Sequence, residues 1–188
     1  NGAGKSTLAR MLCGLQKNGS GTVLWTGKPM SRRLRRKKAY MVMQDVGHQL
    51  FTDSVAAECA LGIKAPNKDE IDRTLEKVDL LAYKERHPLS LSGGQMQRLA
   101  VVVSDICGKE LLVFDEPTSG LDLKSMEEVG ILTRSLATQG KVLLIITHDI
   151  EFMMRICTRI LFIRDGEIVK DLSGGQKEKI VRLLRGEE

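Results

Sequence analysis

The chain has 188 residues, of which 42% are hydrophobic and 28% are charged, and its net charge is +5. This composition is ordinary for a globular protein and suits one domain, or a core with a smaller subdomain. It excludes a membrane-spanning helix within these residues, because no apolar run approaches the roughly 20 residues that a span needs. The four cysteines, Cys13, Cys59, Cys107 and Cys157, are far apart and form no C-x-x-C pair. Their spacing argues against structural zinc and a disulfide framework, and favours a reducing, cytosolic setting.

The chain begins with most of a phosphate-binding loop. Residues 1–7 read NGAGKST, and residues 1–6 fill the last six of the eight positions in the pattern G-x-x-x-x-G-K-[ST]. The two positions before Asn1, which include the first glycine, are absent, so we expect a piece of a longer protein. The small residues at 2–4 let backbone N–H groups turn toward a polyphosphate. Lys5 can reach its outer phosphates, and Ser6 can place a hydroxyl on Mg²⁺.

The elements of the first half are short. We expect strands over 22–26 and 40–43, a helix over about 53–61 and another from about 67. The loop at the start leads into a further helix, whose N-terminal dipole faces the same anion. This first helix is predicted by the spacing of four apolar residues, Leu8, Met11, Leu12 and Leu15.

A basic run carries much of the net charge. It could be a nucleic-acid patch, an anionic-lipid contact or a docking surface. We favour a solvated loop leading into the next strand, because Tyr40 is the only aromatic residue close enough for base stacking. The run comprises Arg32, Arg33, Arg35, Arg36, Lys37 and Lys38.

The second half alternates strands and helices. Strand 111–114 is wholly apolar, as expected of a parallel strand covered on both faces. The alternation predicts an α/β fold with a mainly parallel sheet. Residues 44–90 interrupt it with helices alone and predict an inserted helical subdomain, so the core consists of 1–43 and 109–188. The other predicted elements are helices over 92–107 and 123–137, a strand over 142–146, a further helix, and a hairpin of 159–164 with 167–170.

Two carboxylates follow the apolar strand 111–114. The carboxyl end of a buried strand is where α/β sheets bind ligands. Asp115 could hold Mg²⁺ through water, and Glu116 could orient or deprotonate an attacking water. A strand followed by a polar turn would look similar, but the pairing with Lys5 and Ser6 supports phosphoryl transfer.

The pentapeptide LSGGQ at 91–95 is a second candidate anion site. Ser92 can cap the following helix, while Gly93 and Gly94 leave its first N–H groups bare. One chain cannot easily bring this site to the Lys5 loop, so its natural ligand is a phosphate on a partner chain. A plain capped helix start explains the pentapeptide equally well. LSGGQ recurs at 172–176, where we expect only a glycine-rich cap before a helix over 177–184, since no strand with carboxylates follows it.

These motifs together resemble the nucleotide-binding domain of the ATP-binding-cassette (ABC) family. The order NGAGKST, Gln44, LSGGQ, LLVFDE, SGLD and His148 covers nearly the whole chain. The resemblance implies a P-loop NTPase fold in a single domain over 1–188, a Mg²⁺-dependent ATPase, and a second such domain as partner. The N-terminal antiparallel strands of the family and its adenine-stacking aromatic are largely missing, and Trp25 lies in the wrong place for that role.

The resemblance also implies a set of site residues. Gln44 senses Mg²⁺ and couples to a transmembrane partner, His148 contacts the γ-phosphate, and the loop that ends at Asp122 crosses the dimer interface. The implied catalytic residues are Glu116, His148 and Gln44, and the implied metal ligands are Ser6, Gln44 and Asp115. The implied ATP-binding residues are Asn1, Gly2, Ala3, Gly4, Lys5, Ser6, Thr7, Ser92, Gly93, Gly94, Gln95 and Asp122.

A finer resemblance concerns Gln49-Leu50-Phe51, which looks like the energy-coupling-factor subgroup. ATPases of that subgroup drive uptake of vitamins and metal ions, together with a second ATPase and a transmembrane coupling protein. The resemblance implies a location on the cytoplasmic face of the membrane, and we expect no nucleic-acid partner. The alternative is a soluble ABC ATPase that acts on ribosomes or DNA. A regulatory cassette without hydrolysis fits less well, because Glu116 and His148 are both present.

Overall fold

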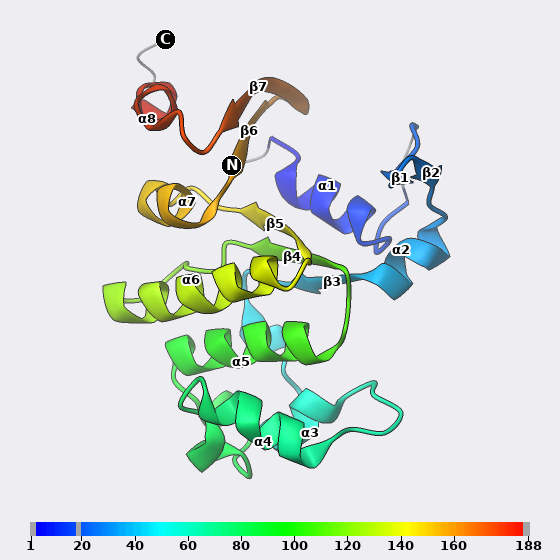
Figure 1. The fold of residues 1–188 in the computed structure, drawn as a ribbon, viewed down its shortest axis with the longest axis vertical. Coiled ribbons are helices and arrows are strands. Elements are labelled where there is room, and N and C mark those ends of the chain that lie inside the picture. The colour runs from blue at the N-terminus through cyan, green and yellow to red at the C-terminus, as the bar shows by residue number, and fades with distance from the viewer. Residues whose placement is uncertain (1–2, 18–19, 186–188) are drawn as a thin grey trace.

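The fold is that of a computed structural model, which describes residues 3–17 and 20–185. Its centre is a three-stranded parallel sheet in the order β3-β4-β5 (Figure 1). The parallel pairing confirms the predicted fold class and places the carboxyl ends of these strands along one edge. The strands are β1 (Leu24–Trp25), β2 (Lys28–Pro29), β3 (Ala39–Val42), β4 (Leu111–Asp115), β5 (Val142–Ile146), β6 (Arg159–Arg164) and β7 (Glu167–Ser173).

Helices cover both faces of the central sheet, with α1 on one face and α5 and α6 on the other (Figure 1). The side chains of β4 alternate accordingly. Val113 packs in one cluster with Ala9 of α1, while Leu112 and Phe114 pack with α5 and α6. This two-sided burial explains the apolar run of β4. The helices are α1 (Lys5–Leu12), α2 (Arg32–Lys38), α3 (Val55–Ala60), α4 (Lys68–Glu76), α5 (Gly93–Ile106), α6 (Leu123–Thr138), α7 (Ile150–Ile156) and α8 (Lys177–Arg185).

The helical subdomain predicted from the sequence is present. Helices α3 and α4 pack against α5, at the end of the molecule opposite the β6–β7 hairpin (Figure 1). Both helices begin at a capping side chain, because Ser54 accepts a hydrogen bond from the N–H of Ala57 and Asn67 accepts from the second and third residues of α4. The buried core of the subdomain includes Val55, Leu75 and Leu99. Its signals were local in the sequence, so its helices were predictable.

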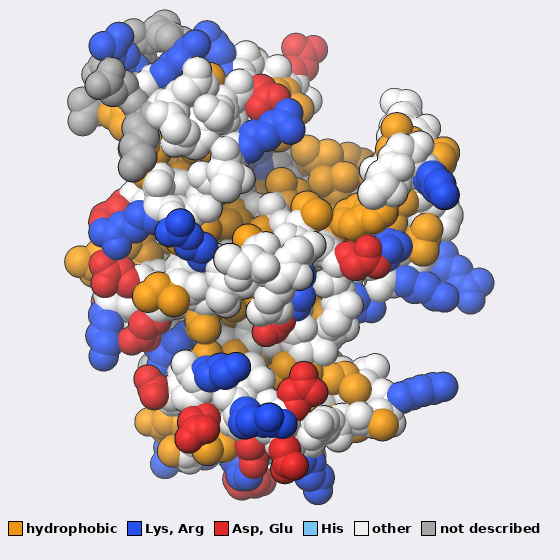
Figure 2. Space-filling model, viewed as in Figure 1, with side chains coloured by type: hydrophobic (Ala, Val, Ile, Leu, Met, Phe, Trp, Pro, Cys, Tyr) orange, Lys and Arg blue, Asp and Glu red, His pale blue; other side chains and the backbone are white. Residues whose placement is uncertain are grey.

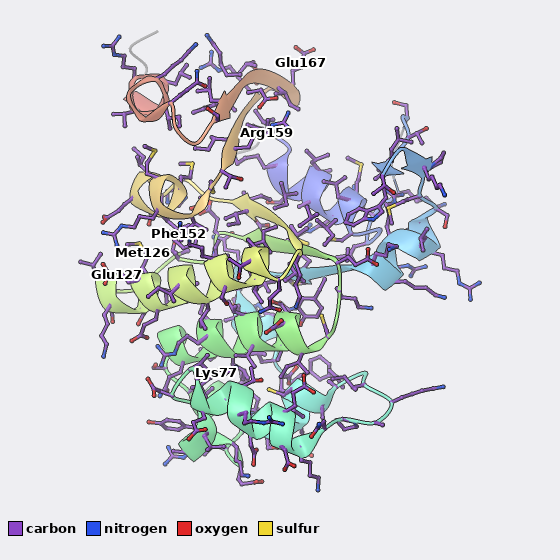
Figure 3. The ribbon with its side chains drawn as sticks, viewed as in Figure 1. Lys77, Met126, Glu127, Phe152, Arg159 and Glu167 are labelled. Atoms are coloured by element: carbon purple, nitrogen blue, oxygen red, sulfur yellow. The ribbon has the colours of Figure 1, made fainter. Side chains whose placement is uncertain are left out.

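The predicted hairpin of the C-terminal part is confirmed, and its second strand is three residues longer than expected. The antiparallel hairpin extends from Arg159 at the start of β6, and Glu167 begins β7 beyond the turn (Figure 3). Residues of β6, β7, α7 and α8 share one small core that contains Ile160, Leu172 and Ile180. The helix predicted over 177–184 is α8.

The basic run forms a helix, so the prediction of a solvated loop was wrong. Ser31 caps α2, and Figure 2 shows Lys and Arg side chains gathered over this helix. Arg35 is only 3% exposed, and its guanidinium donates a 2.6 Å hydrogen bond to the carbonyl of Met11 near the end of α1. The guanidinium of Arg32 donates hydrogen bonds to the carbonyls of Gly14 and Leu15. Contacts with α1, which the local sequence does not reveal, therefore order this segment.

Two other expectations were partly wrong. Helix α1 ends at Leu12, because Gly14 adopts a left-handed φ of 72° and turns the chain away. Leu15 therefore lies beyond the helix and is 47% exposed. The strand expected over 22–26 pairs only at Leu24 and Trp25. Among the residues that the structure describes, no helix is both long and apolar enough to cross a membrane.

Candidate active site

The glycine-rich loop turns sharply into α1. Gly4 has a φ of 84°, and its carbonyl accepts the first helical hydrogen bond from the N–H of Leu8 at 2.9 Å. A Cβ on Gly4 would meet no atom within 4 Å, so the left-handed backbone, not crowding, favours glycine there. The first N–H groups of α1 have no helical partner and can bind an anion. Asn1 and Gly2, which were also predicted to bind phosphate, lie outside the described residues.

A cavity of about 340 Å³ brings together four predicted segments of the site. The loop before α1 forms one wall, and the others come from residues at the carboxyl ends of β3, β4 and β5 or within two residues after them. This convergence follows from the parallel sheet, whose strands all end at the same edge. The lining residues are Ala3, Gly4, Lys5, Ser6, Thr7, Gln44, Asp115, Glu116, Ile146 and His148.

Glu116 and His148 face each other across the ends of β4 and β5. Nδ1 of His148 lies 2.9 Å from Oε2 of Glu116, whose side chain is 14% exposed, whereas that of His148 is 84% exposed. The N–H of Glu116 donates a 2.8 Å hydrogen bond to the carbonyl of Ile146, and Glu116 has a left-handed φ of 51°. That φ is unusual for a residue with a side chain and is typical of functional sites. Ile146 was not predicted as a lining residue, although it ends the buried strand before His148.

The oxygen ligands expected for Mg²⁺ line the same cavity. Asp115 is 6% exposed, and Ser6 and Gln44 also contribute to the cavity wall. A hydroxyl, an amide oxygen and a carboxylate suit Mg²⁺, which binds few protein groups and keeps waters or substrate phosphates as its other ligands. The described residues contain no cluster of three or more His, Cys, Asp or Glu side chains able to hold a metal. The donor set therefore fits Mg²⁺ bound together with a polyphosphate.

The first LSGGQ copy forms a bare helix N-terminus away from this cavity. Ser92 and Gln95 make a reciprocal capping box at the start of α5: the N–H of Ser92 donates to Oε1 of Gln95 at 2.9 Å. Gly93 and Gly94 occupy the first turn and carry no side chain that could block an anion. Neither they nor Asp122 line the 340 Å³ cavity. The structure thus agrees with the prediction that one chain does not join both sites.

The start of α6 lies next to the start of α5. Asp122 caps α6 by accepting a 2.7 Å hydrogen bond from the N–H of Ser125. This hydrogen bond holds the pKa of the Asp122 carboxyl below its usual value. A Cβ on Gly94 would approach Oγ of Ser125 to 2.5 Å. The LSGGQ turn and the loop ending at Asp122 therefore form one surface.

The second LSGGQ copy is a connection between β7 and α8. The N–H of Gly174 donates a 2.8 Å hydrogen bond to the carbonyl of Thr158. A Cβ on Gly174 would stand 2.4 Å from the carbonyl oxygen of Cys157, while one on Gly175 would meet nothing within 4 Å. The crowded glycine is thus the first of the pair here and the second in the copy at 91–95. This difference supports a structural role for the second copy.

Comparison with known proteins agrees with this geometry. Residues 1–119 match the family model described as ABC transporter. The chain belongs to this family. An ABC protein of Treponema denticola, provisionally named an ABC transporter ATP-binding protein, is 59% identical over 180 residues, which is 96% of this chain and 37% of that protein. The chain spans about a third of the length of the first curated relatives that it matches, with shares of 37%, 35% and 29%.

Two solved ABC structures share the fold. CbiO1 from Clostridium perfringens, part of the ABC transporter complex CbiONQ, superposes with a TM-score of 0.82 at 29% identity and covers 99% of this chain and 79% of CbiO1. A bacterial Atm1-family ABC exporter with ATP bound superposes with a TM-score of 0.80 at 25% identity, over 100% of this chain and 34% of the exporter. Both likenesses confirm the ABC ATPase fold.

Proposed function

We propose that this ABC chain binds Mg·ATP at the 340 Å³ cavity and hydrolyses it to drive transport across a membrane. The observation that carries the proposal is the convergence of Lys5, Asp115, Glu116 and His148 on that cavity. A phosphate cradle, a metal carboxylate, a base and an imidazole are the groups that phosphoryl transfer to water uses. We also propose that residues 1–188 act as one ATPase domain, with 44–90 as its helical part.

Each lining residue has a role in this proposal. Lys5 and the N–H groups at the start of α1 bind the outer phosphates, and Thr7 lies beside them. Glu116 orients the attacking water and accepts its proton, while His148 holds the Glu116 carboxylate and contacts the γ-phosphate. Ser6, Gln44 and Asp115, the last through water, would hold Mg²⁺, and the bound ion would supply positive charge to the phosphate oxygens.

A second ABC domain would complete the site. Ser92, which caps α5, and Gly93, the first residue of the helix, are exposed and lie outside the cavity. It can contact the γ-phosphate bound to a partner domain, with Gln95 and Asp122 at the same surface. ATP binding would close the two domains together, and hydrolysis would reopen them.

We propose uptake of vitamins or metal ions, of the energy-coupling-factor type, as the transport process. The supports are Gln49-Leu50-Phe51 and the likeness to CbiO1, which belongs to an ABC transporter complex. In this arrangement the chain lies on the cytoplasmic face of the membrane and contacts a transmembrane coupling protein. The alternative, a soluble ABC ATPase on ribosomes or DNA, has less support, because Arg32 and Arg35 of the basic run bond backbone carbonyls within the chain.

Two variants of the intact protein test the chemistry. Glu116→Gln should keep ATP binding but lower phosphate release by about 10²–10⁴-fold, since an amide cannot accept the proton of water. It should also accumulate an ATP-bound dimer. Lys5→Ala should weaken ATP binding itself. If Glu116→Gln released phosphate at a steady-state rate near that of the parent, the proposed role of Glu116 would be wrong.

Transport is tested separately in cells. Uptake of radiolabelled metal ions and vitamins should drop when the gene is replaced by its Glu116→Gln variant. If hydrolysis is lost while every uptake rate stays unchanged, the ATPase assignment survives and the transport assignment fails. Binding of the intact protein to ribosomes or DNA would then favour the alternative.

A further inference from the structure

The side chain of Gln49 makes hydrogen bonds with β3, the strand that leads to Gln44, and with the residue directly after it. Its Oε1 accepts a 3.0 Å hydrogen bond from the N–H of Met43. Its Nε2 donates to the carbonyl of Met41 at 2.8 Å and to the hydroxyl of Tyr40 at 3.0 Å. Gln49 thus uses both amide protons and its carbonyl oxygen on the last residues of β3 and the residue directly after it.

These hydrogen bonds lie on the edge of β3 that does not face β4. Among the residues that the structure describes, β3 lies at the edge of the three-stranded sheet and pairs only with β4, so every other peptide group of β3 faces away from β4. Met41 and Met43 are two residues apart, and one carboxamide bonds the C=O of the first and the N–H of the second. The side chain of Gln49 therefore satisfies groups that a further strand would otherwise pair.

The segment 44–50, which follows β3, is also held by buried side chains. Val46 and Leu50 are buried in two separate hydrophobic clusters. Between them, the short 3₁₀ helix η1 (Val46–His48) is capped by Asp45, and the N–H of Gln49 donates to the carbonyl of Val46 at 2.9 Å. Gln44 lies between these anchors and the end of β3, and it is one of the residues that line the cavity.

We infer that Gln49 is a positioning residue, whose carboxamide clamps the end of β3 and thereby directs Gln44 into the metal site. Without the clamp, the chain would leave β3 in several directions, and Gln44 would bind metal less often in the correct geometry. Groups that hydrogen-bond a metal ligand directly typically cost 10–100-fold in metal affinity when they are lost, and Gln49 acts on Gln44 one step further away, through the backbone of Met43. The inference rests on the proposed function, because it concerns the Mg²⁺ ligand of that site.

The test compares ATP binding to the intact protein with and without metal. The dissociation constant of ATP is measured in EDTA and in excess Mg²⁺. The value in EDTA divided by the value in Mg²⁺ reports how much the metal contributes to ATP binding. Gln49→Met keeps the length of the side chain and removes all three hydrogen bonds. It should lower the ratio about tenfold while changing the EDTA value less than about twofold.

A second variant and a control accompany this measurement. Gln49→Glu can still accept from Met43, but its carboxylate cannot donate to the carbonyl of Met41, so it should lower the ratio too. If Gln49→Met does not fold, the ratio measured for Gln49→Glu takes its place in the test. Tyr40→Phe removes one of the three hydrogen bonds and leaves both backbone contacts, so its ratio should stay within about twofold of the parent.

The double variant decides whether Gln49 acts through Gln44. If it does, Gln44→Ala combined with Gln49→Met should give the same ratio as Gln44→Ala alone. Additive losses would overturn the positioning role, and so would a parental ratio in both Gln49 variants beside a lowered ratio in Gln44→Ala. A parental ratio in Gln44→Ala itself would instead show that the proposed metal ligand is wrong, and the inference would fall with it.

Discussion

Helices α5 and α6 meet at Gly94 and Ser125, where a Cβ on Gly94 would stand 2.9 Å from the Cβ of Ser125 and 2.5 Å from its Oγ. The contact joins the LSGGQ turn to the helix that Asp122 caps. Gly94 is therefore required by packing, in addition to leaving its N–H group accessible.

Gly94→Ala should destabilise the fold by about 1–3 kcal/mol through overpacking. The Oγ of Ser125 can rotate away, but its Cβ cannot, so the two helix starts must separate. Gly93→Ala is the matched control, because a Cβ there meets nothing within 4 Å and alanine favours the helix. Free energies of unfolding in urea would show the difference, and equal stability of the two variants would contradict the packing argument.

Replacing the serine by arginine should affect the two LSGGQ copies differently. Ser92→Arg should abolish hydrolysis by blocking the γ-phosphate of the partner domain, with little effect on ATP binding to the chain's own loop. Ser173→Arg should leave activity nearly intact, because Ser173 ends β7 next to the turn into α8. Phosphate release and ATP binding by the intact protein measure both effects. Equal damage to hydrolysis from the two changes would show that the second copy also has a catalytic role.

The buried Arg35 of the basic helix should contribute more to stability than its exposed neighbour Arg33. Arg35→Ala should cost about 1–3 kcal/mol, because the carbonyl of Met11 loses its 2.6 Å donor and buried packing is lost. Arg33→Ala, on the exposed side of α2, should change the free energy of unfolding by less than about 0.5 kcal/mol. Denaturant unfolding of both variants makes the comparison, and a similar cost for both would refute the structural role of Arg35.

Buried thiols should make stability depend on alkaline pH. Burial raises the pKa of Cys59 from 9.0 to about 12 and that of Cys13 from 9.0 to about 11. Below pH 9 both thiols keep their protons in the folded and unfolded states. As the pH rises from 9 through 11–12, the unfolded chain loses its protons first, so folding stability falls.

A cysteine variant isolates this effect. Above pH 9, Cys59→Ala should show a shallower loss of unfolding free energy with pH, by up to about 1.4 kcal/mol per pH unit. Its absolute stability is not the readout, since the substitution also leaves a cavity. Parallel slopes for Cys59→Ala and the parent between pH 9 and 10.5 would be inconsistent with the raised pKa.

Local signals in the sequence were enough to predict several elements. The apolar run of β4 and the capping pattern at Ser92 predicted their strand and helix within a residue or two. The carboxylates Asp115 and Glu116 at the end of β4, together with the Lys5 loop, also predicted a site for phosphoryl transfer, because α/β sheets bind ligands at the carboxyl ends of their strands. The role of His148 came from the resemblance to the ABC family.

Features that depend on contacts between distant segments became visible only in the folded chain. Arg35 is buried because α2 packs on the end of α1, and no local pattern distinguishes it from exposed neighbours such as Arg33. Gly94 needs to be small because α6 begins beside it, about 30 residues later in the chain. Gln49 clamps β3 because that strand lies at the outside of the sheet. Burial and strand order arise from packing of the whole chain, so a sequence window cannot contain them.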